Sequence, residues 1–177
     1  MDLGCGAGRH TLMLANLNFE TFACDINKKM IQITKNILVK NNQSSTAEKV
    51  QFGAINNLPF EDKKFDVVVA TGILHQAKSI KKYKKAIKEL SRVLKDEGLV
   101  CLNLFTNKKI CSTFKKVREK KYTYKTKEGA VMTLLPKDYF YEQMKKNRLI
   151  LETEIAEKVK EINTGYRAIL RANFIKK

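Results

Sequence analysis

The apolar residues in the first hundred positions alternate between short continuous runs and stripes at helical spacing. Residues 11–17, 28–38 and 80–94 each carry a stripe that predicts a helix. Four continuous runs are typical of strands that are covered on both faces. They are FETFACD at 19–25, KVQF at 49–52, FDVVVATG at 65–72 and LVCLNLF at 99–105. Strands and helices that alternate in this way predict an α/β fold with a parallel sheet and right-handed crossovers.

Two of the predicted helices have further features that the sequence makes explicit. The first, residues 11–17, is expected to bury a wide apolar face that includes Met13 and Leu17. The helix over 80–94 is expected to end at the segment DEG, because Gly98 can take the left-handed conformation that terminates a helix. The polar stretch NNQSSTAE at 41–48 is expected to be a loop.

The chain after residue 105 follows a different pattern. Residues 106–135 mix lysines and aromatic residues without a clear period. A helix is predicted from Pro136 to Asn147, and two apolar segments near the C-terminus predict an antiparallel hairpin that turns near 163–165. We therefore expect one domain over residues 1–177. Its predicted parts are a core (1–104), a basic insert (105–135) and a closing helix with the hairpin (136–177).

The opening stretch MDLGCGAGRH places alternate glycines between a strand end and a helix start. A backbone without Cβ atoms lets a ligand approach closely, and a helix N-terminus offers unpaired N–H groups. Open parallel sheets bind ligands beyond the carboxyl ends of their strands. A dinucleotide fingerprint would need glycine where Arg9 stands, which disfavours an NAD-dependent oxidoreductase. The carboxylate of Asp2, just before the loop, suits a cationic ligand better than a pyrophosphate.

Four ordered blocks of the sequence resemble a known family. DLGCGAG resembles the first motif of class I S-adenosylmethionine-dependent methyltransferases. FACDIN, NNLPFEDKKFDVVVATGILHQ and ELSRVLKDEGLVCLN resemble later blocks of the methyltransferase type-11 branch. The resemblance covers about residues 1–104. It implies a doubly wound, Rossmann-like, mostly parallel sheet of order 3-2-1-4-5-7-6 that ends in an antiparallel hairpin. It also implies S-adenosyl-L-methionine as cofactor and direct (SN2) methyl transfer to an oxygen or nitrogen acceptor.

The resemblance also implies a role for each matching residue. The glycine loop, with Cys5 between its first two glycines, would lie under the methionine part of the cofactor, with Asp2 near its ammonium group. Asp25 would accept hydrogen bonds from both ribose hydroxyls. The structural alternatives are a simple tight turn for the glycines and a loop cap for Asp25. The full set of predicted cofactor residues is Asp2, Gly4, Cys5, Gly6, Asp25, Ile26, Met30, Ala54, Ile55, Asn56 and Thr71.

Within that set, the residues divide by the part of the cofactor they would meet. Ile26 and Met30 would flank the adenine, and the backbone around Ala54, Ile55 and Asn56 would read its edge. Thr71, at the end of the fourth strand, would lie near the reacting end.

Two departures from the family pattern stand out. Ala54 occupies a position where this branch has a carboxylate, so we expect weakened cofactor affinity, by about 1–3 kcal/mol. Only Met1 precedes Asp2, where a central strand would carry four or five apolar residues in the family, so we expect an N-terminally shortened version of a longer protein. Both features leave a second candidate open, a non-catalytic relative that acts as a binding or partner protein.

Catalysis would depend mainly on alignment of the acceptor with the methyl group. His75, just past the fourth strand, is the candidate general base, and side-chain packing is the alternative reading of it. The two histidines and four isolated cysteines show no metal-ligand spacing, so no metal is expected. The cysteines are expected to be reduced thiols. The sequence has no run of about 18 apolar residues, so it predicts no membrane span. We therefore expect a cytoplasmic protein.

The net charge of +17 has two readings. It can reflect a compositional preference for lysine, or it can form a basic patch for a polyanion. The predicted insert combines lysines with Phe114, Tyr122 and Tyr124, a mixture that could grip RNA or cover a small anionic acceptor. A small-molecule acceptor is the leading expectation, and RNA methylation is the alternative. The sequence leaves the oligomeric state open.

Overall fold

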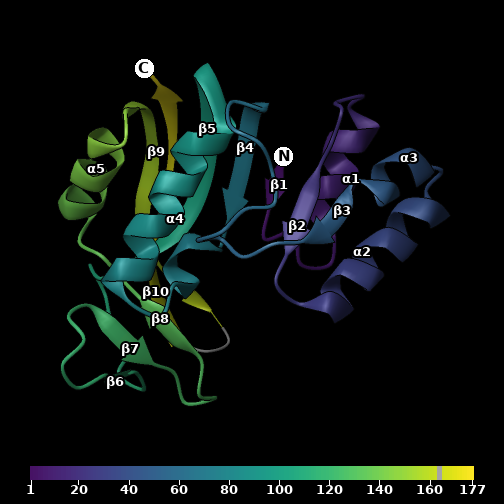
Figure 1. Ribbon diagram of the computed structural model, residues 1–177. Helices are drawn as coiled ribbons and strands as arrows, with labels where there is room; N and C mark the ends of the chain where they lie inside the picture. The colour runs from purple at the N-terminus through teal and green to yellow at the C-terminus, as the bar shows by residue number, and fades with distance from the viewer. Residues whose placement is uncertain (163–164) are drawn as a thin grey trace.

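A seven-stranded sheet forms the centre of the computed structural model, which describes residues 1–162 and 165–177. Its strand order is β3-β2-β1-β4-β5-β10-β9 (Figure 1). The strands from β3 to β5 pair in parallel, and β10 pairs antiparallel with both β5 and β9. The bounds are β1 (Asp2–Leu3), β2 (Ala23–Asp25), β3 (Val50–Phe52), β4 (Phe65–Thr71), β5 (Leu94–Thr106), β9 (Leu149–Ile162) and β10 (Gly165–Lys176).

The predicted α/β fold and strand order are confirmed. Three short strands of a second sheet, β6 (Lys115–Lys116), β7 (Thr123–Lys125) and β8 (Val131–Thr133), lie between β5 and β9 in the chain. They shift the numbering, so the order that ends in β10-β9 is the expected 3-2-1-4-5-7-6 when only the main sheet is counted. The turn expected at 163–165 includes two positions, 163 and 164, that lie outside the described residues.

The helices form two buried clusters with the sheet. In the larger cluster, α4 (Ile80–Val93) and α5 (Lys137–Lys146) pack side chains such as Tyr83 and Phe140 against β4, β5 and β10. The smaller cluster joins α1 (Arg9–Asn16), α2 (Lys28–Lys40) and α3 (Ser44–Glu48) to β2 and β3. Figure 1 shows α4 and α5 together over one half of the sheet and α1 to α3 around the other half. Among the described residues, no helix is both long and apolar enough to cross a membrane.

Three local expectations are wrong. The wide buried face of the first helix is not present, because Met13 is 47% and Leu17 62% exposed. Helix α4 ends at Val93, and the chain enters β5 at once, so the left-handed residue nearby is Glu97 (φ 61°) rather than Gly98. The expected loop at 41–48 contains the short helix α3. In the second case the cause is non-local, since β4 pairs with β5 from its first residue onward.

The insert, whose sequence shows no clear hydrophobic period, folds as the small antiparallel sheet β6-β7-β8. It is tied to the core by the hydroxyl of Thr133, which donates to the carbonyl of Ala77 at 2.7 Å. Ala77 directly follows η1 (Leu74–Gln76), the single turn of 3₁₀ helix after β4. Figure 1 shows the small sheet beyond the carboxyl ends of β4 and β5. The insert is therefore placed at the edge of the main sheet where α/β proteins bind ligands.

Candidate functional site

The glycine loop between β1 and α1 depends on glycine at its two tightest points. Gly4 has φ +72°, and a Cβ there would lie 2.5 Å from Cγ1 of Ile73. Gly8 has φ +83°, and a Cβ there would lie 2.9 Å from Cγ2 of Thr34. Both positions combine a left-handed backbone with a close neighbour, so other residues would be strained there. The loop is thus held against the segment after β4 on one side and against α2 on the other.

Asp25, the last residue of β2, is bound to this loop. Its Oδ2 accepts a hydrogen bond from the N–H of Gly6 at 2.9 Å, and its Oδ1 accepts one from the N–H of Asn27 at 2.8 Å. The carboxylate is half-buried, so one side of it remains open to a ligand. The two N–H bonds fix its orientation beside the glycine loop.

Thr34 supports the same loop and was missed by sequence reasoning. It is fully buried on α2, and its hydroxyl donates to the carbonyl of Gly6 at 2.7 Å. The available signal was a polar residue on the helix face that Met30, Ile33 and Ile37 otherwise make apolar. A short β-branched side chain that can hydrogen-bond the loop is what this position requires.

A cavity of about 240 Å³ opens at the carboxyl ends of the parallel strands, next to Asp25. Six predicted cofactor residues line it: Gly4, Asp25, Ile26, Ala54, Ile55 and Asn56. Ile73, Gln76 and Lys78, from the segment between β4 and α4, also line it and were not predicted. The same is true of Lys82, in the first turn of α4. Among the residues that the structure describes, Asp25 is the sole carboxylate in this lining, which also includes two lysines. Ile26 presents an apolar side chain that is 64% exposed.

The remaining predicted cofactor residues lie outside the cavity lining. Asp2 is 2% exposed and accepts a hydrogen bond from the hydroxyl of Thr11 at 2.7 Å, and burial raises the pKa of its carboxyl. Cys5 is buried, and burial raises the pKa of its thiol to about 11. Met30 and Thr71 are half-buried, in the first turn of α2 and at the end of β4. The residues predicted to contact the adenine edge and the ribose therefore line the cavity together, whereas most of those predicted for the methionine part do not.

His75 is in the interior of the protein. Its side chain is 3% exposed, its Nδ1 accepts a hydrogen bond from the N–H of Phe105 at 3.2 Å, and its ring stacks on that of Phe105 at 4.2 Å. Burial, with a smaller effect of the Arg167 charge, lowers the pKa of the imidazole to about 3. His75 is thus neutral and packed, which favours the packing alternative; the general-base role stays a prediction.

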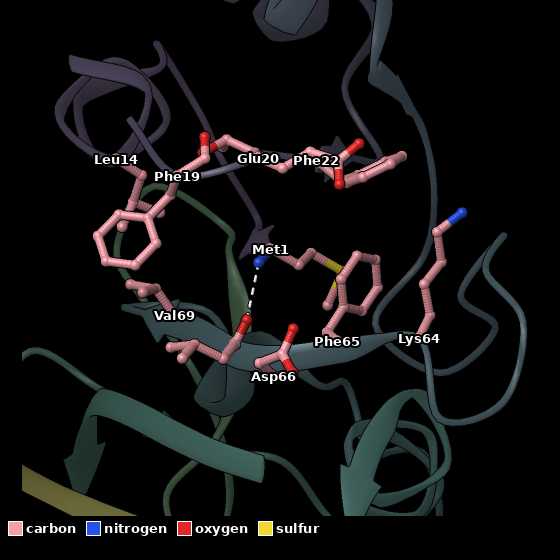
Figure 2. Close-up of a pocket in the computed structure, with 11 residues that line it drawn as sticks. Met1, Leu14, Phe19, Glu20, Phe22, Lys64, Phe65, Asp66 and Val69 are labelled. Atoms are coloured by element: carbon pink, nitrogen blue, oxygen red, sulfur yellow. Dashed lines mark hydrogen bonds between the residues drawn. The ribbon is translucent and has the colours of Figure 1, made fainter. Parts of the chain in front are cut away.

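A larger cavity, of about 510 Å³, lies at the opposite edge of the sheet (Figure 2). Figure 2 shows Phe19, Phe22 and Phe65 around Met1, whose ammonium group donates to the carbonyl of Val67 at 2.8 Å. This cavity is at the amino ends of β1 and β4, and its walls are mainly aromatic and aliphatic. We take the smaller cavity as the functional site, because it combines convergent polar groups with the carboxyl ends of the strands. No cluster of three or more metal-ligating side chains occurs in residues 1–162 and 165–177.

The fold and the glycine loop with its bound carboxylate find their counterpart in known proteins. Residues 1–102 match the family described as "Methyltransferase domain", which is more than half of the chain. The chain belongs to this methyltransferase family. Its predicted membership of the class I S-adenosylmethionine-dependent methyltransferases is confirmed.

Individual relatives share the same part of the chain. The methyltransferase is 30% identical over 100 residues to the uncharacterized methyltransferase YcgJ of Bacillus subtilis (strain 168), a match that covers 55% of this chain and 37% of that protein. It is 30% identical over 101 residues to the probable tRNA methyltransferase 9B of Mus musculus, with 55% of this chain and 19% of that protein covered. The chain thus spans well under half the length of these curated relatives.

A solved structure extends the likeness to the whole chain. A SAM-dependent methyltransferase from Methanosarcina mazei superposes with a TM-score of 0.81 and 19% sequence identity, over 99% of this chain and 90% of that one. At this identity the likeness concerns the fold. It includes the hairpin β9–β10 and the region of the insert, which the family match does not reach.

Proposed function

We propose that this methyltransferase binds S-adenosylmethionine in the cavity at the carboxyl ends of its strands and transfers the methyl group directly to an oxygen or nitrogen acceptor. The observation that carries the proposal is the Asp25 carboxylate, held by the N–H groups of Gly6 and Asn27 beside the cavity. A carboxylate in this position can accept two hydroxyl hydrogen bonds from a ribose. When bound, the cofactor supplies a methyl group already activated on a sulfonium centre.

The chain's own residues divide the binding work. The exposed side chain of Ile26 offers an apolar surface to a purine ring, and the main chain of Ala54, Ile55 and Asn56 offers polar groups to its edge. Because Asp2 is bound to Thr11 beneath the loop, its negative charge acts on a cationic ligand through the loop rather than by direct contact. The roles of Met30 and Thr71, which are outside the cavity lining, stay predictions.

The acceptor is less sharply defined than the cofactor. A small-molecule acceptor stays a prediction, as does a cytoplasmic location. The relative named as a probable tRNA methyltransferase supports RNA as the alternative. With His75 neutral and buried, alignment of the acceptor would supply most of the rate that the protein contributes.

A second candidate, a non-catalytic relative of the same fold, is favoured by one observation. Ala54 contributes no carboxylate to the cavity, so Asp25 is its single acidic contact in the described part of the chain. Calorimetric titration with S-adenosylhomocysteine separates the two candidates. We expect one binding event per chain and a raised melting temperature. Absence of both heat and thermal shift would favour the non-catalytic candidate and reject the proposed function.

A further inference from the structure

Two lysines of the small sheet face each other across a strand pair. In the antiparallel pair β6–β7, Lys115 lies directly opposite Lys125, and both side chains are exposed. Directly opposed residues share a face with Cβ atoms about 5 Å apart, and like charges in this arrangement destabilise the pair. An anion placed between the two ammonium groups would remove that repulsion. The register of the strands therefore indicates an anion-binding position.

The opposed lysines lie on the face of the small sheet that packs against Ala77. Alternate residues of a strand share a face, so Lys125 shares its face with Thr123, whose cross-strand partner is Thr133. Thr133 donates to the carbonyl of Ala77, and Ala77 lines the cavity. A ligand that contacts the lysine pair is thus on the same side of the insert as the proposed cofactor site.

Positive charge continues around this pair. Acidic side chains in the insert are limited to Glu119 and Glu128. In the described part of the chain, only one salt bridge involves a lysine of the insert, and it joins Lys108 to Glu157. Seven basic side chains between positions 115 and 127 are exposed: Lys115, Lys116, Arg118, Lys120, Lys121, Lys125 and Lys127.

The distribution of these charges favours a polyanion over a small anion. Lys78 and Lys82 carry the positive charge from the insert into the lining of the cavity itself. One small anion could neutralise one or two of these groups, whereas a chain of phosphates can pair with many and release counterions as it binds. The surface is therefore matched to a repeating phosphate backbone.

The opposite face of the small sheet offers a stacking surface. Across the three strands, Lys116 lies opposite Tyr124, and Tyr124 lies opposite Met132. Tyr124 and Met132 are half-buried, and Lys116 is exposed. An aromatic ring beside a lysine can stack an unpaired base while the lysine pairs with the adjoining phosphate. Because β6 is at the edge of the small sheet, a flexible single strand that passes over this edge can contact the lysine pair on one face and Tyr124 on the other, whereas a closed duplex cannot.

We propose that the insert binds a loop of single-stranded RNA and that RNA is the class of acceptor presented to the cavity. The proposal rests on the proposed methyltransferase function and replaces the small-molecule expectation for the acceptor. RNA folds into stems with unpaired loops, and the bases of such loops can turn out into a pocket. DNA is mostly duplex, in which the bases remain stacked and out of reach.

The test measures binding of a fluorescein-labelled RNA hairpin with a short unpaired loop, by anisotropy over a range of salt concentrations. The double substitution Lys115→Gln/Lys125→Gln should weaken binding about tenfold or more at 0.1 M salt and lower the salt slope by about 1.4, as expected for two lost phosphate contacts. Because it removes opposed like charges, it should leave the melting temperature unchanged or raise it.

A matched control separates a local surface from overall charge. Lys40→Gln/Lys145→Gln makes the same charge change at exposed positions on α2 and α5 and should change RNA affinity by about twofold or less. Equal losses in both variants, or none in Lys115→Gln/Lys125→Gln, would overturn the proposal. Equally tight binding of a closed DNA duplex of the same length would also overturn it, because the argued contacts need unpaired bases. If the variant fails to fold, Lys120→Gln/Lys121→Gln tests the same surface.

Failure of this inference can be told apart from failure of the proposed function. Calorimetry with S-adenosylhomocysteine on the same preparations reports the cofactor site alone. Intact cofactor binding without RNA binding would reject the RNA surface and leave the methyltransferase assignment standing.

Discussion

The two cavities at opposite edges of the sheet differ in chemistry more than in size. The larger one, around Met1, is walled mostly by aromatic and aliphatic side chains. The smaller one holds a glycine loop, an oriented carboxylate and two lysines. The difference teaches that convergent polar groups, rather than volume, identify the functional edge of this fold.

The strand geometry explains why the edges differ. At the carboxyl ends, the loops that follow β1, β2, β3 and β4 meet, and each brings polar backbone groups or side chains to one place. At the amino ends, β1 pairs with β4 at a single residue pair, Asp2 opposite Val69. The space between β2 and β4 below that pair is bordered mainly by apolar side chains, together with the amino group of Met1 and the side chains of Glu20, Lys64 and Asp66.

Replacing one carboxylate at each edge should give the largest difference between the two cavities, measured as affinity for S-adenosylhomocysteine. Asp25→Asn should weaken S-adenosylhomocysteine binding about 100-fold, because charge-assisted bonds to the ribose are lost while the side-chain shape is kept. Asp66→Asn removes a carboxylate from the larger cavity and should leave that affinity unchanged. Calorimetry on both variants is the measurement. Equal affinities for the two would mean that the cofactor is not bound at Asp25.

The glycine loop should be the part of the functional edge least tolerant of a methyl group. Gly4→Ala should lower the free energy of unfolding by about 2–3 kcal/mol, since the new Cβ meets Ile73 and the backbone is left-handed. Gly6→Ala is the matched control, because its Cβ would meet no atom within 4 Å, and it should cost about 1 kcal/mol of backbone strain. Urea unfolding measures both. A larger loss for Gly6→Ala would contradict the described packing of the loop.

The buried amino group of Met1, in the larger cavity, should make the stability of the protein depend on pH. Burial lowers the pKa of the Met1 amino group from 8.0 to about 6. Between these values the unfolded chain binds more protons than the folded one, so stability rises with pH across that window and is lost again as pH falls. The gain should be up to about 2.7 kcal/mol between pH 6 and pH 8, as measured by urea unfolding.

N-terminal acetylation supplies the control for the pH effect. The acetylated protein has no titrating amino group, so its stability should lack this rise. The contribution of His75, whose pKa burial lowers to about 3, is common to both forms and cancels in the difference. Identical pH profiles for the two forms would show that the amino group is solvated rather than buried.

Part of the site was predictable because its signals are local. A strand run that ends in Asp25, about twenty residues after a glycine-rich turn, places both at one sheet edge whatever the rest of the chain does. The contributions of Ile73, Gln76, Lys78 and Lys82 were not predictable, because they depend on how the segment after β4 folds back over the loop. For Thr34 the sequence shows only a polar residue on an apolar helix face, and its bond to the loop depends on how α2 packs against that loop.

The sequence by itself determined the parallel α/β architecture, the glycine loop and the position of Asp25, because apolar runs and turn-forming residues act through near neighbours in the chain. Only the tertiary structure decided that β5 begins directly after α4, that His75 is buried and that the insert pairs into a sheet with two lysines opposed. Strand register and burial arise between residues far apart in sequence, so no local pattern could record them.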